Sequence, residues 1–172
     1  MIRLLLGGTR SGKSALGETL LAAGPVPHRV VATGQGLDCA MRERIRAHKR
    51  ARRPGVAVIE VGAEAMDVLA REAGHGGTVL LDSLDFWLFA CHHQGVEHSA
   101  ALARGLSPYA GPDGPELIVV SAETGLGPVA ADAATRHFID ALGGLNQAAA
   151  ALADDVRLVV AGLCVQLKGN AP

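Results

Sequence analysis

The residues best suited to chemistry are the eight at positions 7–14, which read Gly-Gly-Thr-Arg-Ser-Gly-Lys-Ser. They fit the phosphate-binding loop (P-loop) pattern Gly-x-x-x-x-Gly-Lys-Ser/Thr. Its glycines let the backbone turn tightly, so that N–H groups point inward and cradle phosphate oxygens. We expect Lys13 to place a charge on the β- and γ-phosphates from an exposed position, and the Ser14 hydroxyl to bind Mg²⁺. The candidate nucleotide-binding residues of this stretch are Gly7, Gly8, Thr9, Arg10, Ser11, Gly12, Lys13 and Ser14.

The residues on either side of the motif indicate whether it is a nucleotide-binding loop or a chance match. The apolar run 2–6 precedes the loop and suits a buried strand, while Leu16 and Leu20 follow it one helical turn apart. The alternative is a chance match in a chain with 22 glycines. A strand, a glycine loop and a helix in this order favour a nucleoside triphosphate site, where the helix dipole also attracts the anion.

A second motif, residues 79–82, consists of three apolar residues that end in Asp82. The pattern is typical of a Walker B strand, whose carboxylate lies at the carboxyl edge of a parallel sheet and faces the P-loop. Asp82 would then hold Mg²⁺ directly or through water. The alternative is an ordinary aspartate that begins a helix. Because a P-loop is present, we favour the metal role, which makes Ser14 and Asp82 the candidate metal ligands.

Histidines offer two further candidates. His48 lies on an expected basic helix that begins at Asp38, one turn after Arg44, and neighbouring cations favour a neutral, nucleophilic imidazole. From spacing alone, a solvent-facing histidine is the simpler interpretation. The run Cys91-His92-His93 suggests a metal site, but neighbouring side chains on a helix diverge. We interpret this run as structural or as part of a substrate-facing surface.

The order of the expected elements predicts the fold class. Strands and helices alternate, and most strands are apolar on both faces, which is typical of a parallel sheet covered by helices on both sides. We predict one α/β domain over residues 1–172, similar to P-loop NTPases, with a last strand turned back as an antiparallel edge. The expected strands are 2–6, 28–33, 56–61, 78–82, 116–121, 156–160 and 163–167; the expected helices follow the P-loop up to Gly24, begin at Asp38, and cover 65–70, 86–89 and 131–153.

Composition excludes several classes of protein. The chain has 172 residues with 16 Lys and Arg against 17 Asp and Glu, and few aromatic residues, which argues against a general nucleic-acid binder. Cys39, Cys91 and Cys164 are far apart and form no CxxC pair, so we expect no disulfide or zinc site and a cytoplasmic location. We find no signal-peptide layout and no apolar run long enough to span a membrane.

Taken together, these motifs resemble the bifunctional adenosylcobinamide kinase/adenosylcobinamide-phosphate guanylyltransferase family of cobalamin assembly. The P-loop is similar to that family's GGxRSGKS. Three further stretches carry the resemblance over nearly the whole chain: Ala32-Thr33-Gly34-Gln35 with Met41, Arg44-Ile45 and His48; Gly125-Leu126-Gly127 with Arg136 to Asp140, Gly143 and Asn146-Gln147; and Leu158 to Gly162.

The resemblance implies an activity and roles for residues. It implies phosphorylation of adenosylcobinamide by ATP or GTP, and transfer of GMP from GTP to the phosphate through His48, which would carry GMP covalently. It also implies a mostly parallel sheet with one antiparallel strand, and a homotrimer. The candidate catalytic residues are His48 and Lys13, and the nucleotide-binding candidates outside the loop are Thr33, Gly34, Gln35, Arg44, Glu60 and Asp82.

The chain also departs from the family pattern where substrate is expected. Ala122 replaces an asparagine, Asp85 a threonine and Ala90 a second asparagine, while Glu123 remains a candidate carboxylate at this edge. Two alternatives therefore stay open: a small-molecule P-loop kinase without guanylyltransferase activity, and a non-catalytic GTP-binding regulatory relative. The sequence does not distinguish ATP from GTP as the phosphoryl donor.

Overall fold

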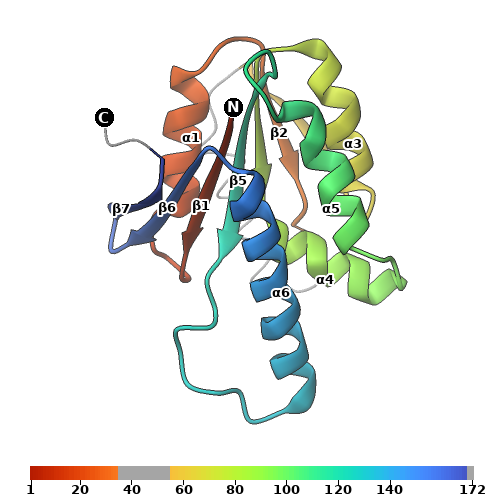
Figure 1. Ribbon diagram of the computed structural model, residues 1–172, viewed down its shortest axis with the longest axis vertical. Coiled ribbons are helices and arrows are strands. Elements are labelled where there is room, and N and C mark those ends of the chain that lie inside the picture. Colours follow the sequence, from red (N-terminus) through yellow and green to blue (C-terminus); the bar gives the residue numbers. More distant parts are fainter. Residues whose placement is uncertain (35–54, 170–172) are drawn as a thin grey trace.

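The fold is built on one seven-stranded sheet. The computed structural model describes residues 1–34 and 55–169 (Figure 1). The strand order is β3-β2-β4-β5-β1-β6-β7; every neighbouring pair is parallel except β6 and β7, which are antiparallel. The predicted fold class, with its antiparallel last strand, is therefore confirmed. In chain order the elements are β1 (Ile2–Gly7), α1 (Lys13–Ala23), β2 (His28–Ala32), β3 (Ala57–Glu60), α3 (Ala65–Glu72), η1 (Ala73–His75), β4 (Thr78–Asp82), α4 (Leu84–Gln94), α5 (Ser99–Leu106), η2 (Ser107–Tyr109), β5 (Glu116–Ala122), α6 (Ala133–Leu152), β6 (Asp155–Val160) and β7 (Leu163–Lys168).

The central strands are buried on both faces, and β1 illustrates why. Leu5 points into a small cluster with Leu21 of α1, while Leu4 and Leu6 point into the main core on the other face. That main core contains apolar side chains from α3, α4, α5 and α6, so these four helices cover the face opposite α1. A strand without a polar face can be stable only between two helical layers, as here.

The largest buried side chains also have hydrogen-bond partners. Trp87 of α4 donates its ring N–H to the carbonyl of Ala63 at 2.9 Å, and Tyr109 donates its hydroxyl to the carbonyl of Leu69 at 2.9 Å. Both rings are fully buried. These two bonds connect α4 to the residues just before α3 and η2 to the middle of α3, and they remove the cost of burying a polar atom without a partner.

The expected strands all agree with the structure to within one residue at each end. The helix α5 was not predicted from the sequence. It is only eight residues long, and its buried face, with Ala101, Leu102 and Leu106, packs against α3 and α6. None of the helices within residues 1–34 and 55–169 is long and apolar enough to cross a membrane.

Candidate nucleotide-binding site

The loop at residues 8–12 joins β1 to α1, as the P-loop pattern predicts. Arg10 and Gly12 both have positive φ angles, of 57° and 100°, and the N–H of Ser11 donates to the carbonyl of Gly8 at 3.3 Å. Within the described residues no side chain caps the start of α1, and its first turn contains no acidic residue. The partial positive charge of the helix N-terminus is therefore directed at whatever lies in the loop, which suits an anion.

Close packing fixes the base of this loop. A Cβ atom on Gly7 would lie 2.5 Å from the carbonyl oxygen of Val159 and 2.6 Å from Oγ of Ser11, while one on Gly8 would meet nothing within 4 Å. Ser11 is buried, and its hydroxyl has no hydrogen-bond partner in the described part of the chain. The first glycine of the motif is thus required by its strand neighbours, not only by the turn.

Lys13 lies in the loop, but its predicted exposure is wrong. Only 7% of the residue is exposed, and its ammonium group donates to the carbonyl of Gly8 at 3.0 Å. The side chain folds back across the loop, so its aliphatic part is covered while its ammonium group is hydrogen-bonded to a backbone carbonyl. A phosphate bound here would compete with that carbonyl for the ammonium group.

Asp82 ends β4 at the same edge of the sheet as Lys13, as predicted. One strand, β5, separates β4 from β1, and along β5 Asp82 lies beside Val120 whereas Gly7 lies beside Ala122. Asp82 is therefore two strands and two residues away from the end of β1, about 10 Å sideways and about 7 Å along the strands.

The donor atoms suit Mg²⁺. Ser14 offers a hydroxyl oxygen and Asp82 a carboxylate, and Mg²⁺ prefers oxygen ligands while keeping several waters. Within the described residues no cluster of three or more His, Cys, Asp or Glu side chains could hold a metal. An ion here would therefore take most of its ligands from water and phosphate, as Mg²⁺ commonly does.

Thr33 and Glu60 lie at the same edge but farther from the loop. Thr33 is fully buried, and its hydroxyl donates to the carbonyl of Ser83 at 2.6 Å and accepts from the N–H of Ser83 at 2.8 Å. It therefore ties the residue after Asp82 to the end of β2. Glu60 ends β3, four strands from β1 or about 19 Å, so the structure does not bring it to the loop. Gly34 follows Thr33, whereas Gln35, Arg44 and His48 lie outside the described residues.

The end of β5 is held by a side-chain network. Ser121 donates its hydroxyl to the side-chain carbonyl of Asn146 at 2.6 Å, and the amide of Asn146 donates to the carbonyl of Ala122 at 3.0 Å. The next residue, Glu123, donates its backbone N–H to the carbonyl of Gly7 at 3.1 Å. Asn146 of α6 therefore fixes the strand end that carries Glu123 against the base of the P-loop.

One contact of the loop was missed by the sequence reasoning. The N–H of Gly162, in the turn between β6 and β7, donates to the carbonyl of Ser11 at 2.8 Å. The Ala161-Gly162 pair marks a turn in the sequence, but nothing in the pattern indicates what that turn touches. The order β1-β6-β7 in the sheet brings it beside the loop.

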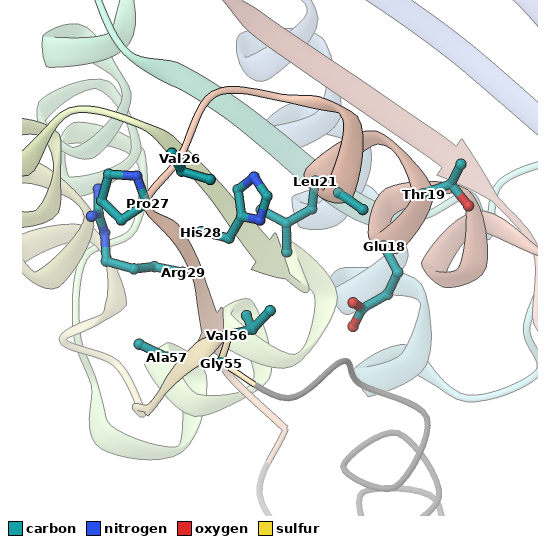
Figure 2. Close-up of a pocket in the computed structure, with 11 residues that line it drawn as sticks. Glu18, Thr19, Leu21, Val26, Pro27, His28, Arg29, Gly55, Val56 and Ala57 are labelled. Atoms are coloured by element: carbon teal, nitrogen blue, oxygen red, sulfur yellow. The ribbon is translucent and has the colours of Figure 1, made fainter.

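A separate hollow of about 570 Å³ lies at the other end of α1 (Figure 2). It is lined by the second half of α1, the starts of β2 and β3 and the residues before them. His28 bonds the carbonyl of Gly24 through Nε2 at 3.0 Å, and the hydroxyl of Thr19 donates to the carbonyl of Ala15. This hollow is at the sheet edge opposite the P-loop, and among the described residues none of the predicted site lines it.

Comparisons with known proteins identify the family to which the chain belongs. A family model described as "Cobinamide kinase / cobinamide phosphate guanyltransferase" matches residues 3–167. The "Bifunctional adenosylcobalamin biosynthesis protein CobP" of Pseudomonas aeruginosa is 38% identical over 173 residues, covering 97% of each chain. The "Bifunctional adenosylcobalamin biosynthesis protein CobU" of Salmonella typhimurium is 28% identical over 185 residues, covering 98% of this chain and all of the relative.

Solved structures show likeness of fold alone. The type III secretion ATPase EscN of enteropathogenic E. coli, in complex with its stalk EscO, superposes with a TM-score of 0.61 at 12% identity, over 92% of this chain. A prototypical ATPase from the type III secretion system of pathogenic bacteria superposes with a TM-score of 0.56, also at 12% identity, over 96% of this chain. The chain spans only 41% and 56% of the lengths of these two ATPases.

Proposed function

The chain belongs to the cobinamide kinase / cobinamide phosphate guanyltransferase family, and we propose that it catalyses both reactions of that description. As a kinase, it transfers the γ-phosphoryl group of a nucleoside triphosphate to the aminopropanol hydroxyl of adenosylcobinamide. As a guanylyltransferase, it transfers GMP from GTP to the resulting phosphate, giving adenosylcobinamide-GDP and pyrophosphate. The enzyme is a transferase.

The observation that carries this proposal is the placement of the P-loop and Asp82 at one sheet edge. In the proposed kinase step, the loop N–H groups and Lys13 stabilise charge on the transferring phosphoryl group. Ser14 and Asp82 would hold Mg²⁺, which supplies further positive charge to the phosphates when bound. The bond from the γ-phosphorus to the bridging oxygen breaks and one to the substrate oxygen forms, so the nucleoside diphosphate leaves and the hydroxyl proton is released to solvent.

For the second reaction we propose His48 as the nucleophile, on the strength of the family resemblance. A ring nitrogen would attack the α-phosphorus of GTP and release pyrophosphate, and the corrinoid phosphate would then displace the histidine. Protein incubated with Mg²⁺ and α-labelled GTP should keep acid-labile, alkali-stable label after denaturation. His48→Ala should lose the label and keep reversible GTP binding. Label found on another residue would remove His48 from the mechanism.

One mixing experiment tests the whole proposal. Protein, Mg-GTP and adenosylcobinamide are combined, and the corrinoid mass is measured with time. Both products should appear in turn, first the phosphate and then the GDP derivative. A phosphate that accumulates without the second product would indicate a kinase alone, and GTP binding without any corrinoid product would indicate a regulatory relative. Replacing GTP by ATP in the first step identifies the phosphoryl donor.

We also propose a homotrimer in the cytoplasm. The trimer rests on the family resemblance, and the free thiols of Cys91 and Cys164 support a reducing compartment. Light scattering should give a particle of three times the chain mass of 17.6 kDa. A particle of one or two chain masses at working concentration would contradict the trimer.

A further inference from the structure

The hairpin of β6 and β7 forms one wall beside the P-loop. Its turn, Ala161-Gly162, has positive φ angles of 53° and 79°, which suits a two-residue hairpin. The turn is bonded to the loop through Gly162 and Ser11, and a Cβ on Gly12 would lie 3.2 Å from Cα of Gly162. The last pair of the hairpin, Val160 and Leu163, is therefore held in a fixed position next to the nucleotide loop.

This last pair exposes apolar surface at the sheet edge that carries the P-loop. Val160 is 54% exposed and Leu163 is 74% exposed, whereas Val159, one residue earlier, is buried. Val165 and Leu167 of β7 are also exposed, at 54% and 58%, so apolar side chains continue along this strand, and Val160 and Leu163 are the part of that surface next to the P-loop. A contiguous exposed apolar surface is typical of a site that a ligand or partner covers. Neither side chain offers a hydrogen bond, so an occupant would be bound by its apolar or aromatic surface.

The order of the strands places Asp82 and the hairpin on opposite sides of the P-loop. Asp82 lies on the β4 side of β1, and the hairpin lies on the opposite side, since β6 pairs directly with β1. If the γ-phosphate is directed toward Asp82 and its Mg²⁺, the other end of the nucleotide extends toward β6 and β7. That end is the nucleoside, whose purine ring has two apolar faces.

We propose that Val160 and Leu163 form the base-binding surface of the P-loop nucleotide, on which the purine ring of the triphosphate packs. The inference rests on the proposed function, because it needs a triphosphate in the loop. It adds a residue pair that the P-loop motif does not contain. An aliphatic surface without donors or acceptors accepts guanine and adenine alike, so this pair contributes affinity for purine nucleotides and no choice between them.

Two ligands separate this subsite from the phosphate loop. Inorganic tripolyphosphate carries the phosphates of GTP without the nucleoside, so it reports on the loop alone. Leu163→Ser should raise the Kd of Mg-GTP and of Mg-ATP by about fivefold, and leave the Kd of Mg-tripolyphosphate unchanged, in titration calorimetry. Leu167→Ser is the matched control: it lies in the same strand, is 58% exposed, and is at the far end from the turn. It should change none of these constants.

The remaining outcomes overturn the proposal. Equal weakening of GTP and tripolyphosphate by Leu163→Ser would mean that the hairpin only shapes the loop. Unchanged GTP binding, or a wild-type protein that binds GTP no more tightly than tripolyphosphate, would remove the base surface while leaving the phosphate loop intact. A change in particle mass on Leu163→Ser, with GTP binding lost in proportion, would assign this surface to a contact between copies of the chain. If the wild-type protein binds neither the nucleotides nor tripolyphosphate, the nucleotide site itself is wrong.

Discussion

Lys13 is the single residue on which the proposed chemistry depends most. It already donates to the carbonyl of Gly8, so its ammonium group is placed inside the loop before a ligand arrives. Lys13→Ala should weaken Mg-GTP binding in calorimetry and lower phosphoryl transfer by about 100-fold or more, because a preorganised donor to the transferring group is lost. The control is Lys168→Ala, which removes the same charge from a side chain bonded to the last turn of α6. Equal GTP affinity in Lys13→Ala would mean that the loop is only structural.

The first two glycines of the motif, Gly7 and Gly8, differ in how much space a side chain would have. Gly7→Ala places a Cβ against the carbonyl of Val159 and the hydroxyl of Ser11, and backbone must move to accept it. We expect a loss of about 1–3 kcal/mol in the free energy of unfolding and a clear loss of GTP binding. Gly8→Ala meets nothing and should cost less than about 0.5 kcal/mol. Urea denaturation of both variants checks this; equal losses would show that packing is not the reason for Gly7.

Among the elements, β5 and α6 are joined by a pair of buried polar side chains near the P-loop. Asn146→Ala leaves the hydroxyl of Ser121 and the carbonyl of Ala122 without their partners, which should cost about 1–3 kcal/mol of stability. Gln147→Ala, the exposed neighbour on the same helix, should cost less than about 0.5 kcal/mol. Thermal and urea unfolding measure both variants. If the two variants lose the same stability, the network contributes nothing.

Helices and strands could be predicted from the sequence where a local pattern of apolar and turn residues marks them. Each strand is a short apolar run between turn residues, so its ends followed directly from the pattern. The buried residues of α5 (Ala101, Leu102, Gly105 and Leu106) are at helical spacing, but eight residues give too short a pattern to distinguish a helix from the loop that follows it. The missed contact between the β6–β7 turn and Ser11 has another reason, because it depends on which strands are neighbours in the sheet.

The residues of the candidate site, too, could be predicted only where a local sequence motif marks them. The P-loop and Asp82 were predictable because each is a motif attached to a strand, and parallel strands bring their carboxyl ends to one edge. The burial of Lys13 was not predictable, because the side chain folds onto a carbonyl of its own loop. The full burial of Thr33 depends on a bond to Ser83, fifty residues away in the sequence. The contact of Thr33 is set by tertiary structure and leaves no local pattern in the sequence.

At the scale of the whole molecule, the thiol of Cys91 in the main core makes the stability of the fold depend on pH. It is fully buried in α4, and burial, helped by the negative charge of Glu97, raises the pKa of its thiol from 9.0 to about 11. In the unfolded chain the thiol ionises near 9.0, so unfolding releases a proton that the folded protein retains. Stability from this group is therefore complete below about pH 9 and declines as the pH rises toward 11.

This linkage can be isolated from the other groups that titrate in alkali. Between pH 8 and pH 10 the wild type should lose about 1 kcal/mol more unfolding free energy than Cys91→Ala, because only the wild type carries the buried thiol. Cys91→Ala will be less stable at every pH, since it leaves a cavity, but that cost does not depend on pH. Cys164→Ala, which removes an exposed thiol, should follow the wild type. Urea denaturation at both pH values measures all three proteins, and parallel curves for the wild type and Cys91→Ala would mean that the core opens to solvent around α4 well before the sheet unfolds.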